Sequence, residues 1–444
     1  MPGGIWTSQN KVLPGVYIRF KTGTALGLTV GERGVVTICE PMSWGPVAQV
    51  TTVTLTTDVT PITGYDITAP QNQFLQEMFK GTNRTSAPTT ILLYRPTASG
   101  SAQAKVTTGE LTATAVYPGA RGNDISLIIT ELTEPESTFT VSTVVDGAIV
   151  DQQTAAQISE LVANAWVTFS GTGALAATTG AALTGGADGT VQSAAYSAYL
   201  TAIEPYKFDI MVYDGTDSTV QTALLSFIKR VNENNGQYCQ LVASGLSNPD
   251  SRYVININSP VTLSDGTELT PQQVTWWAGG ASAGALYNQS LTYAQYPGAV
   301  STTMQTVDQF TQAVQAGNFV LFAENGVVKV MQDINSLTTY TEDIGQVYSK
   351  NRVMRLCNTI ANDIFQQFSE SFIGVVNNNE QGRARFQAAI VGYLQEIQDN
   401  QGIQNFTSDD VEVLAGSAID AIVVNVAIQA VDSVEKIYMT IEVS

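Results

Sequence analysis

The chain has 444 residues and a formal net charge of −19, from 20 Lys and Arg against 39 Asp and Glu. This acidic balance argues against binding to nucleic acid or to an anionic membrane surface. The length suits two to four domains, and 44% hydrophobic residues suffice for a folded chain. The absence of histidine excludes His-dependent acyl-transfer triads and His-x-x-x-His metal sites. The dispersed Cys39, Cys239 and Cys357 form no Cys-x-x-Cys pair and are expected to be buried apolar fillers.

Residues 1–22 hold too little apolar material for a core of their own and are predicted to form an extended arm. The arm ends in a period-two alternation, which is typical of a strand with one covered face. The alternating residues are Val16, Tyr17, Ile18, Arg19 and Phe20. The first residues lack the apolar core of a signal peptide, and no stretch approaches the roughly 20 apolar residues that span a bilayer. We therefore expect a folded, soluble protein that is made in the cytoplasm and is not inserted into a membrane.

Residues 23–97 are predicted to be the first part of an α/β main domain. A β-rich run at 35–38 and a short buried-strand candidate at 91–94 flank an apolar group with helical spacing at 74–79.

Composition changes at about residue 97. From 98 to 189 the chain is rich in Thr, Ala, Ser and Gly, which predicts a β-rich domain inserted into the main domain. Strand-like stretches are found at 109–116, 124–131 and 138–145. The segment 155–166 is predicted to be a helix, and the small, polar run at 171–189 suits a linker that closes the insertion.

Residues 190–345 are predicted to complete the main domain. A strand–helix–strand pattern over residues 208–243 argues for a βαβ crossover and a sheet that is at least partly parallel. Asn325 and Gly326 lie between two short apolar runs and predict a hairpin, because both residues accept positive φ.

Residues 346–444 are predicted to form an α+β C-terminal domain. Apolar residues recur every three or four positions from 353 to 372 and again from 386 to 397, which predicts two helices. Two β-patterned runs close the chain, at 422–428 and at 437–443. In the last run, Ile437, Met439, Ile441 and Val443 alternate with Tyr438, Thr440 and Glu442. A terminal strand this regular must pair with something, because an unpaired edge invites association.

The sequence contains only weak matches to catalytic and ligand-binding motifs. Gly-Ala-Ser-Ala-Gly at 280–284 matches the nucleophile elbow of hydrolases, which needs a preceding strand and a later histidine. The segment before it looks helical and histidine is absent, so close helix packing on small residues is the expected role. The Gly-rich run at 171–176 lacks a βαβ frame, and acid pairs such as Asp409 and Asp410 are expected to be surface charges. We therefore expect no catalytic, cofactor-binding or metal-binding residues.

Lys350, Arg352 and Arg355 stand out in a chain with few cations. They are predicted to share a broad helix face opposite the apolar stripe, either as solubilising charges or as a docking surface for an acidic partner.

Several motifs, in their order along the chain, resemble those of contractile tail sheath proteins. The resemblance runs from the end of the N-terminal arm, through the inserted domain and its return junction, to the C-terminal domain. The matching residues are Leu-Pro-Gly-Val-Tyr-Ile at 13–18, Trp44-Gly45-Pro46, Tyr-Pro-Gly-Ala-Arg-Gly-Asn-Asp at 117–124, Leu-Thr-Gly-Gly-Ala-Asp-Gly at 183–189, Arg383, Phe386 and the closing run at 434–443.

The resemblance implies a structural subunit, and not an enzyme, of a phage tail or a phage-tail-like bacteriocin. Such subunits polymerise helically around an inner tube and contract to drive the tube through a target cell envelope. The implied partners are copies of the chain, the inner tube protein, and baseplate and tail terminator proteins, and the implied place of assembly is the host bacterial cytoplasm.

In this family, the N-terminal arm and the C-terminal strand of neighbouring subunits complete a sheet on a third subunit. The resemblance therefore assigns linking roles to Val16, Tyr17, Ile18 and Phe20, and to Ile437, Met439, Ile441 and Val443. It also makes Lys350, Arg352 and Arg355 candidates for contact with the tube. Deletion of residues 435–444 should leave a folded monomer that cannot polymerise.

Two other classes stay open from the sequence. A secreted or surface-array structural protein fits the acidic, Thr- and Gly-rich composition, but should carry a secretion signal. A hydrolase that uses carboxylates without histidine would lose activity when a specific Asp or Glu pair is changed. Electron microscopy separates these classes, because only a sheath predicts hollow helical tubes of fixed diameter.

Overall fold

The computed structural model of the chain describes residues 3–4, 10–18, 31, 33–134 and 137–442. These residues belong to two compact units. Unit 1 comprises residues 1–37, 77–91 and 206–444, and unit 2 comprises residues 38–76 and 92–205. The chain passes from one unit to the other within β3 (Val35–Cys39), α2 (Gln73–Met78) and β5 (Thr90–Tyr94), and again after α3 (Ser193–Ile203).

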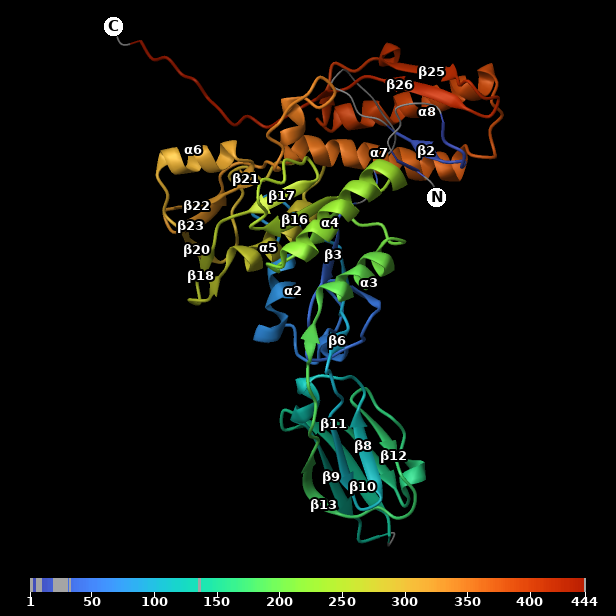
Figure 1. Ribbon diagram of the computed structural model, residues 1–444, viewed down its shortest axis with the longest axis vertical. Helices are drawn as coiled ribbons and strands as arrows, with labels where there is room; N and C mark the ends of the chain where they lie inside the picture. Colours follow the sequence, from blue (N-terminus) through green and yellow to red (C-terminus); the bar gives the residue numbers. More distant parts are fainter. Residues whose placement is uncertain (1–2, 5–9, 19–30, 32, 135–136, 443–444) are drawn as a thin grey trace. The chain divides into compact units, whose positions relative to one another are not determined.

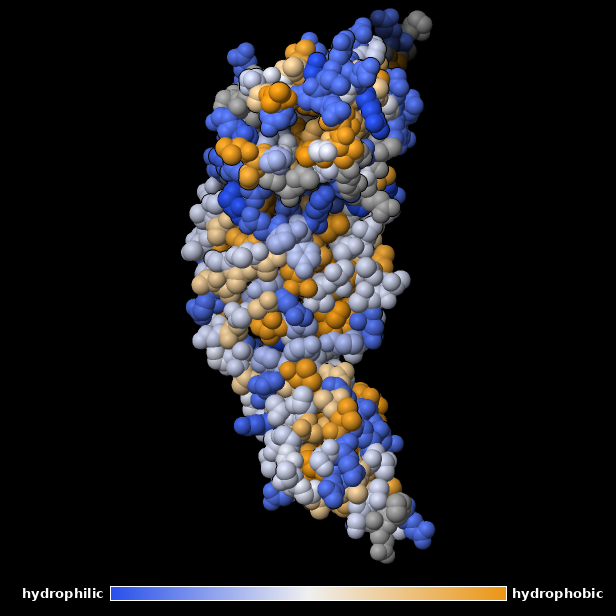
Figure 2. Space-filling view, turned by 90° about the vertical axis from the view of Figure 1, so that its right-hand side faces the viewer, coloured by the Kyte–Doolittle hydropathy of each residue, from blue (hydrophilic) through white to orange (hydrophobic). Residues whose placement is uncertain are grey.

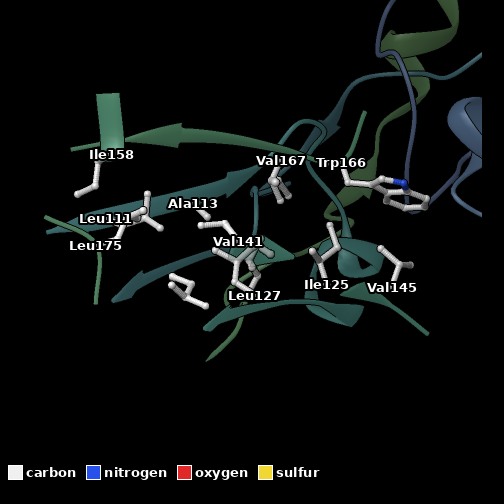
Figure 3. Packing of buried hydrophobic residues seen from close by; sticks show 14 of the residues in the cluster. Leu111, Ala113, Ile125, Leu127, Val141, Val145, Ile158, Trp166, Val167 and Leu175 are labelled. Atoms are coloured by element: carbon white, nitrogen blue, oxygen red, sulfur yellow. The ribbon is translucent and has the colours of Figure 1, made fainter. Parts of the chain in front are cut away.

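Unit 2 contains a β-sandwich (Figure 1). One sheet has the strand order β11-β10-β9-β13 and the other has the order β12-β8-β7. The strands are β7 (Lys105–Thr108), β8 (Leu111–Ala115), β9 (Ile125–Glu131), β10 (Phe139–Val145), β11 (Ala148–Ala155), β12 (Val167–Ser170) and β13 (Thr178–Ala182). Alternate residues of β8 and β9 are buried, and Figure 3 shows the side chains of Leu111, Ala113, Ile125 and Leu127 within this core. The β-rich character that the composition predicts is confirmed.

Two predictions within the sandwich are wrong. The segment 155–166 is not a helix but a three-residue 3₁₀ turn (Ile158–Glu160) in an irregular loop. Side chains satisfy part of the backbone there: the Asn164 Oδ1 accepts from the N–H groups of Trp166 and Val167, both at 2.9 Å. The segment 171–189 is not a plain linker, because it contains β13, which pairs antiparallel with β9.

Motif residues of unit 2 pack at one end of the sandwich core. The Trp44 ring lies 4.9 Å from the Trp166 ring and 5.4 Å from the Tyr117 ring, measured between centroids. The Arg121 Nε donates to the Gly64 carbonyl at 2.8 Å, and its terminal nitrogens pair with both oxygens of Asp146. These sequence motifs therefore serve packing and bidentate ion pairing. The remaining elements of unit 2 are β4 (Val50–Val53), α1 (Thr60–Thr63), β6 (Ala98–Ser99) and β14 (Thr190–Val191).

Unit 1 contains a run of parallel strands. β15 (Ile210–Val212), β16 (Gln240–Ser244), β17 (Val254–Ile257) and β21 (Asn318–Phe319) pair in that order. Helix α4 (Ser218–Arg230) connects β15 to β16; Asp217 caps its start by accepting from the Thr219 N–H at 2.8 Å. The predicted βαβ crossover is confirmed.

Helix α5 (Pro271–Gly284) packs closely on the chain at residues 77–91. A Cβ atom at Gly280 would collide with the carbonyl oxygen of Met78, and one at Gly284 with that of Ser86. Ser282 lies between these glycines and is fully buried inside the helix. The expected role of this motif in helix packing is confirmed.

The rest of the main part of unit 1 is antiparallel. β18 (Val261–Leu263) pairs with β19 (Glu268–Leu269) and β20 (Ala299–Thr302), and α6 (Val307–Gln315) follows. β22 (Leu321–Glu324) and β23 (Val327–Val330) form the predicted hairpin, in which Asn325 and Gly326 have φ of 53° and 75°.

Two long helices and two two-stranded sheets form the C-terminal part of unit 1. Helices α7 (Asn351–Ser371) and α8 (Glu380–Asp399) confirm the predicted pair, and Leu356 and Ile360 of α7 share a buried cluster with Phe386 and Ile390 of α8. β25 (Val411–Ala415) and β26 (Ile422–Val426) form a hairpin beside α8 (Figure 1). β24 (Ile403–Gln404) pairs with β27 (Gln429–Ala430). Of the helices in the described ranges, none is both long and apolar enough to cross a membrane.

Candidate inter-subunit linking segments

The end of the chain is an extended segment with exposed apolar side chains. Residues 436–442 have no secondary structure, and the predicted strand at 437–443 has no partner within the described residues. Ile437, Tyr438, Met439 and Ile441 are between 75% and 91% exposed. Burying such a side chain stabilises a protein by roughly 1.5–3 kcal/mol. The segment therefore has the side-chain pattern of a strand with one covered face, but nothing in the described part of the chain covers it. Val443 lies outside the described residues.

Exposed large apolar side chains also occur elsewhere, such as Met304 at 95% and Ile419 at 96% exposure. On the face drawn in Figure 2, hydrophobic residues lie in small groups between hydrophilic ones, as is usual for a folded protein.

The N-terminal candidates are partly engaged within their own chain. β2 (Val16–Tyr17) pairs in parallel with β1 (Gly3–Gly4), and the Ile18 N–H donates to the Gly4 carbonyl at 2.8 Å. Val16 is buried, whereas Tyr17 and Ile18 are half-buried. Just before them, Val12 is 94% exposed. Phe20 lies outside the described residues, and the linking role of this strand stays a prediction.

The hairpin β25–β26 offers two open edges. It is a two-stranded sheet in the described part of the chain, so each strand has one neighbour. Its inner side chains Val411, Val413 and Val424 pack on the α7–α8 cluster. A two-stranded sheet is marginally stable without further strands or a packed face. The hairpin therefore has a fixed face and, on each strand, one edge that pairs with no further strand in the described part of the chain.

The three candidate cations do not share an exposed helix face. Arg355 is fully buried and forms an ion pair with Asp333. Arg352 is buried as well and donates to the Gln401 carbonyl at 3.2 Å. The expectation of a solvated basic face is wrong for these two residues, because a buried guanidinium needs internal partners. Contact of the three residues with a tube stays a prediction, against which the burial of Arg355 argues.

Lys350 instead contacts acidic residues just before the exposed C-terminal segment. Its Nζ forms an ion pair with Glu435, and Asp432 lies 3.9 Å away. Burial raises the pKa of Glu435, but hydrogen bonds from Lys350, Gln332 and Thr292 outweigh it and hold that pKa below its usual range. Sequence reasoning missed Glu435, because its partners lie 85 to 143 positions away in the chain.

A second carboxylate that the sequence does not reveal lies on α7. Asp363 accepts from the Gly31 N–H at 2.9 Å and from the Tyr393 hydroxyl at 2.8 Å. Burial raises the pKa of Asp363 to about 6, although both hydrogen bonds lower it. The Asp363 carboxylate therefore links Gly31 to α7, on which it lies, and to α8, which carries Tyr393.

The cysteines and Asp410 of the Asp409–Asp410 pair have structural roles. All three cysteines are free and buried, as expected, and burial raises the pKa of Cys357 to about 12. Asp410 caps a 3₁₀ turn by accepting from the Thr407 N–H at 2.8 Å. Within the described ranges, no group of three or more Cys, Asp or Glu side chains is arranged to hold a metal ion.

Family models for phage tail sheath proteins match consecutive parts of the chain. The tail sheath protein Gp18 domain III N-terminal region matches residues 33–95, and the beta-sandwich domain matches 98–188. The central domain matches 189–336 and the C-terminal domain matches 343–444.

Relatives and solved structures agree with these models. Two Bacillus subtilis proteins, the uncharacterized protein YqbK and the phage-like element PBSX protein XkdK, are 35% and 32% identical over 100% of both chains. The crystal structure of the sheath tail protein from Desulfitobacterium hafniense is 40% identical, with a TM-score of 0.85 over 96% of this chain and 99% of that chain. The contracted helical sheath of the anti-feeding prophage, at 14% identity and a TM-score of 0.56, shares the fold over 97% and 99% of the two chains. The chain belongs to the phage tail sheath protein family.

Proposed function

We propose that the chain is the subunit of a contractile sheath in which the segment 436–444 is donated to a neighbouring copy. The observation that carries this proposal is the exposed, alternating run at 437–442, which has no strand partner among the residues that the structure describes. The edges of the hairpin β25–β26 are its complement, because in the described residues each strand has one edge without a strand neighbour, beside an apolar face. The N-terminal strand at Val16–Tyr17 is proposed as the second linking segment.

Strand addition suits a polymer whose subunits move during contraction. Its many directional hydrogen bonds hold two copies together with little constraint on how the rigid bodies are oriented. Nine residues follow Glu435, so the segment reaches about 30 Å at roughly 3.4 Å per residue. The link therefore survives a change in packing between rings.

The energy of contraction comes from new contacts between subunits, with no nucleotide consumed and no catalytic role for the chain. A gain of about 1–2 kcal/mol per subunit, the scale of one or two hydrogen bonds, sums to a large stroke over many copies. The likeness to a contracted sheath supports this mechanism. The further partners are an inner tube protein, a baseplate and a tail terminator, in a phage or tail-like particle assembled in the bacterial cytoplasm.

Deletion of residues 436–444 tests the proposal while it leaves Glu435 in place. We expect the shortened chain to keep the thermal unfolding temperature of the full chain, because the large apolar side chains of 437–441 are at least 75% exposed and add little to the core. Electron microscopy should show helical tubes from the full chain and from a Glu442→Gln control, and none from the deletion. Tubes of normal diameter and length from the deletion would refute strand donation.

A further inference from the structure

We infer that Glu435 is the anchor that fixes where the donated C-terminal segment leaves the body of its own subunit. This inference rests on the proposed function and names a positioning residue for it.

Glu435 gathers donors from three distant parts of unit 1. Its Oε1 accepts from the Thr292 hydroxyl at 2.8 Å, and its Oε2 accepts from the Gln332 Nε2 at 2.6 Å and from the Lys350 Nζ. Thr292 follows α5, Gln332 follows β23, and Lys350 immediately precedes α7. The side chains of Glu435 and Lys350 are only 11% and 22% exposed, so water screens this pair less than a surface pair.

The contacts of Glu435 mark a boundary in the chain. Upstream, the Val431 N–H donates to the Gly402 carbonyl at 3.0 Å, next to the β24–β27 pair. Between these two points Val434 is 84% exposed, so apolar packing of that side chain does not hold the chain there. Downstream, Ile437 and the residues after it are exposed. The carboxylate of Glu435 is therefore the last attachment before the free segment begins.

The position of this attachment sets the length of the link. With Glu435 attached, nine residues follow it; with Glu435 released, thirteen residues follow Val431. At about 3.4 Å per residue the reach grows from about 30 Å to about 45 Å. A longer flexible link lowers the effective concentration of the strand at its partner and couples the two bodies more loosely. Anchoring thus makes the movement of one subunit pull directly on the next.

Cleavage by trypsin after Lys436 tests the anchor in the full chain before assembly, because a protease needs the residues around its target to be free and extended. Lys350→Met removes the ion pairs with Glu435 and Asp432 without altering the cleaved segment. We expect cleavage after Lys436 to become roughly tenfold faster, since a charged hydrogen bond is lost. Lys329→Met is the matched control: it removes an ion pair from a lysine of similar exposure, 19%, whose partner Glu324 does not belong to the C-terminal segment, and it should leave the rate unchanged. Lys350→Arg keeps the charge and should keep the slow rate.

Electron microscopy of assembled tubes tests the consequence. Lys350→Met tubes should show a broader distribution of ring-to-ring distances than tubes of the full chain or of Lys329→Met. Equal cleavage rates for Lys350→Met and Lys329→Met would overturn the anchor, as would equal distributions of ring spacing. Either result leaves strand donation standing if the deletion of 436–444 still abolishes tubes. Tubes from that deletion would instead overturn the proposed function itself.

Discussion

The buried pair Asp333–Arg355 allows a quantitative prediction for unit 1. Arg355 is fully buried, and Asp333 is its ion-pair partner. Asp333 also accepts from the Leu291 N–H at 2.9 Å and from the Asn351 Nδ2 at 3.0 Å. One carboxylate thus joins the loop after α5 to the first turn of α7. Asp333→Asn removes its charge while nearly preserving its shape.

The expected loss is large because the guanidinium stays behind without a counter-charge. Breaking a buried ion pair from one side costs about 3–5 kcal/mol. The pair Lys329–Glu324, at 2.6 Å, has a carboxylate that is 53% exposed and contributes at most about 1 kcal/mol. Removing both charges of the buried pair, in Asp333→Asn with Arg355→Met, should recover much of the loss, because no lone charge remains buried.

Thermal unfolding measured by calorimetry separates these cases. Asp333→Asn should lower the transition of unit 1 by roughly 5 °C or more, whereas the control Glu324→Gln should shift it by far less. The double variant should unfold at a higher temperature than Asp333→Asn alone. A loss in Asp333→Asn no greater than in Glu324→Gln would refute the reasoning that Arg355 depends on this carboxylate.

Two further predictions concern the helices. The pKa of Asp363 is raised to about 6 in the folded chain, above the unfolded value of about 3.9. Between these values the folded state binds more protons than the unfolded state, so the free energy of unfolding falls by roughly 2–3 kcal/mol as pH rises from about 4 to 6. Chemical denaturation across this pH range should show that slope, and Asp363→Asn should flatten it; an unchanged slope would contradict the assignment. Gly284→Ala should lower the unfolding temperature, because the added Cβ would collide with the Ser86 carbonyl. Gly392→Ala should raise it, because the Cβ meets nothing within 4 Å and the change removes a glycine from α8. The same direction of shift for both variants would contradict the packing argument.

Local patterns predicted the elements whose cause is local. The helical spacing in α4 and the Asn325-Gly326 turn each depend on neighbouring residues, and both are present. The error at 155–166 arose because apolar spacing there resembles a helix, while Ile158 and Trp166 are instead buried in the sandwich core. β13 escaped notice since its Ala and Gly residues disfavour a strand, and its partner β9 defines it.

In the candidate linking segments, too, local features could be predicted from the sequence and contacts between distant residues could not. The alternation at 437–443 is legible in the sequence, whereas its lack of a partner within the described chain is a property of the whole fold. The buried roles of Arg352 and Arg355 could not be predicted, because charged residues at the start of a helix usually face water. Their partners, such as Asp333 and the Gln401 carbonyl, lie in other parts of the chain and carry no local signal.

A cryo-electron microscopy map of the assembled polymer tests strand donation most directly. Our account predicts that residues 437–442 form a strand hydrogen-bonded to an edge of the hairpin β25–β26 of a different subunit. Density that leads this segment back onto its own subunit, or leaves it unpaired between the subunits, would contradict it.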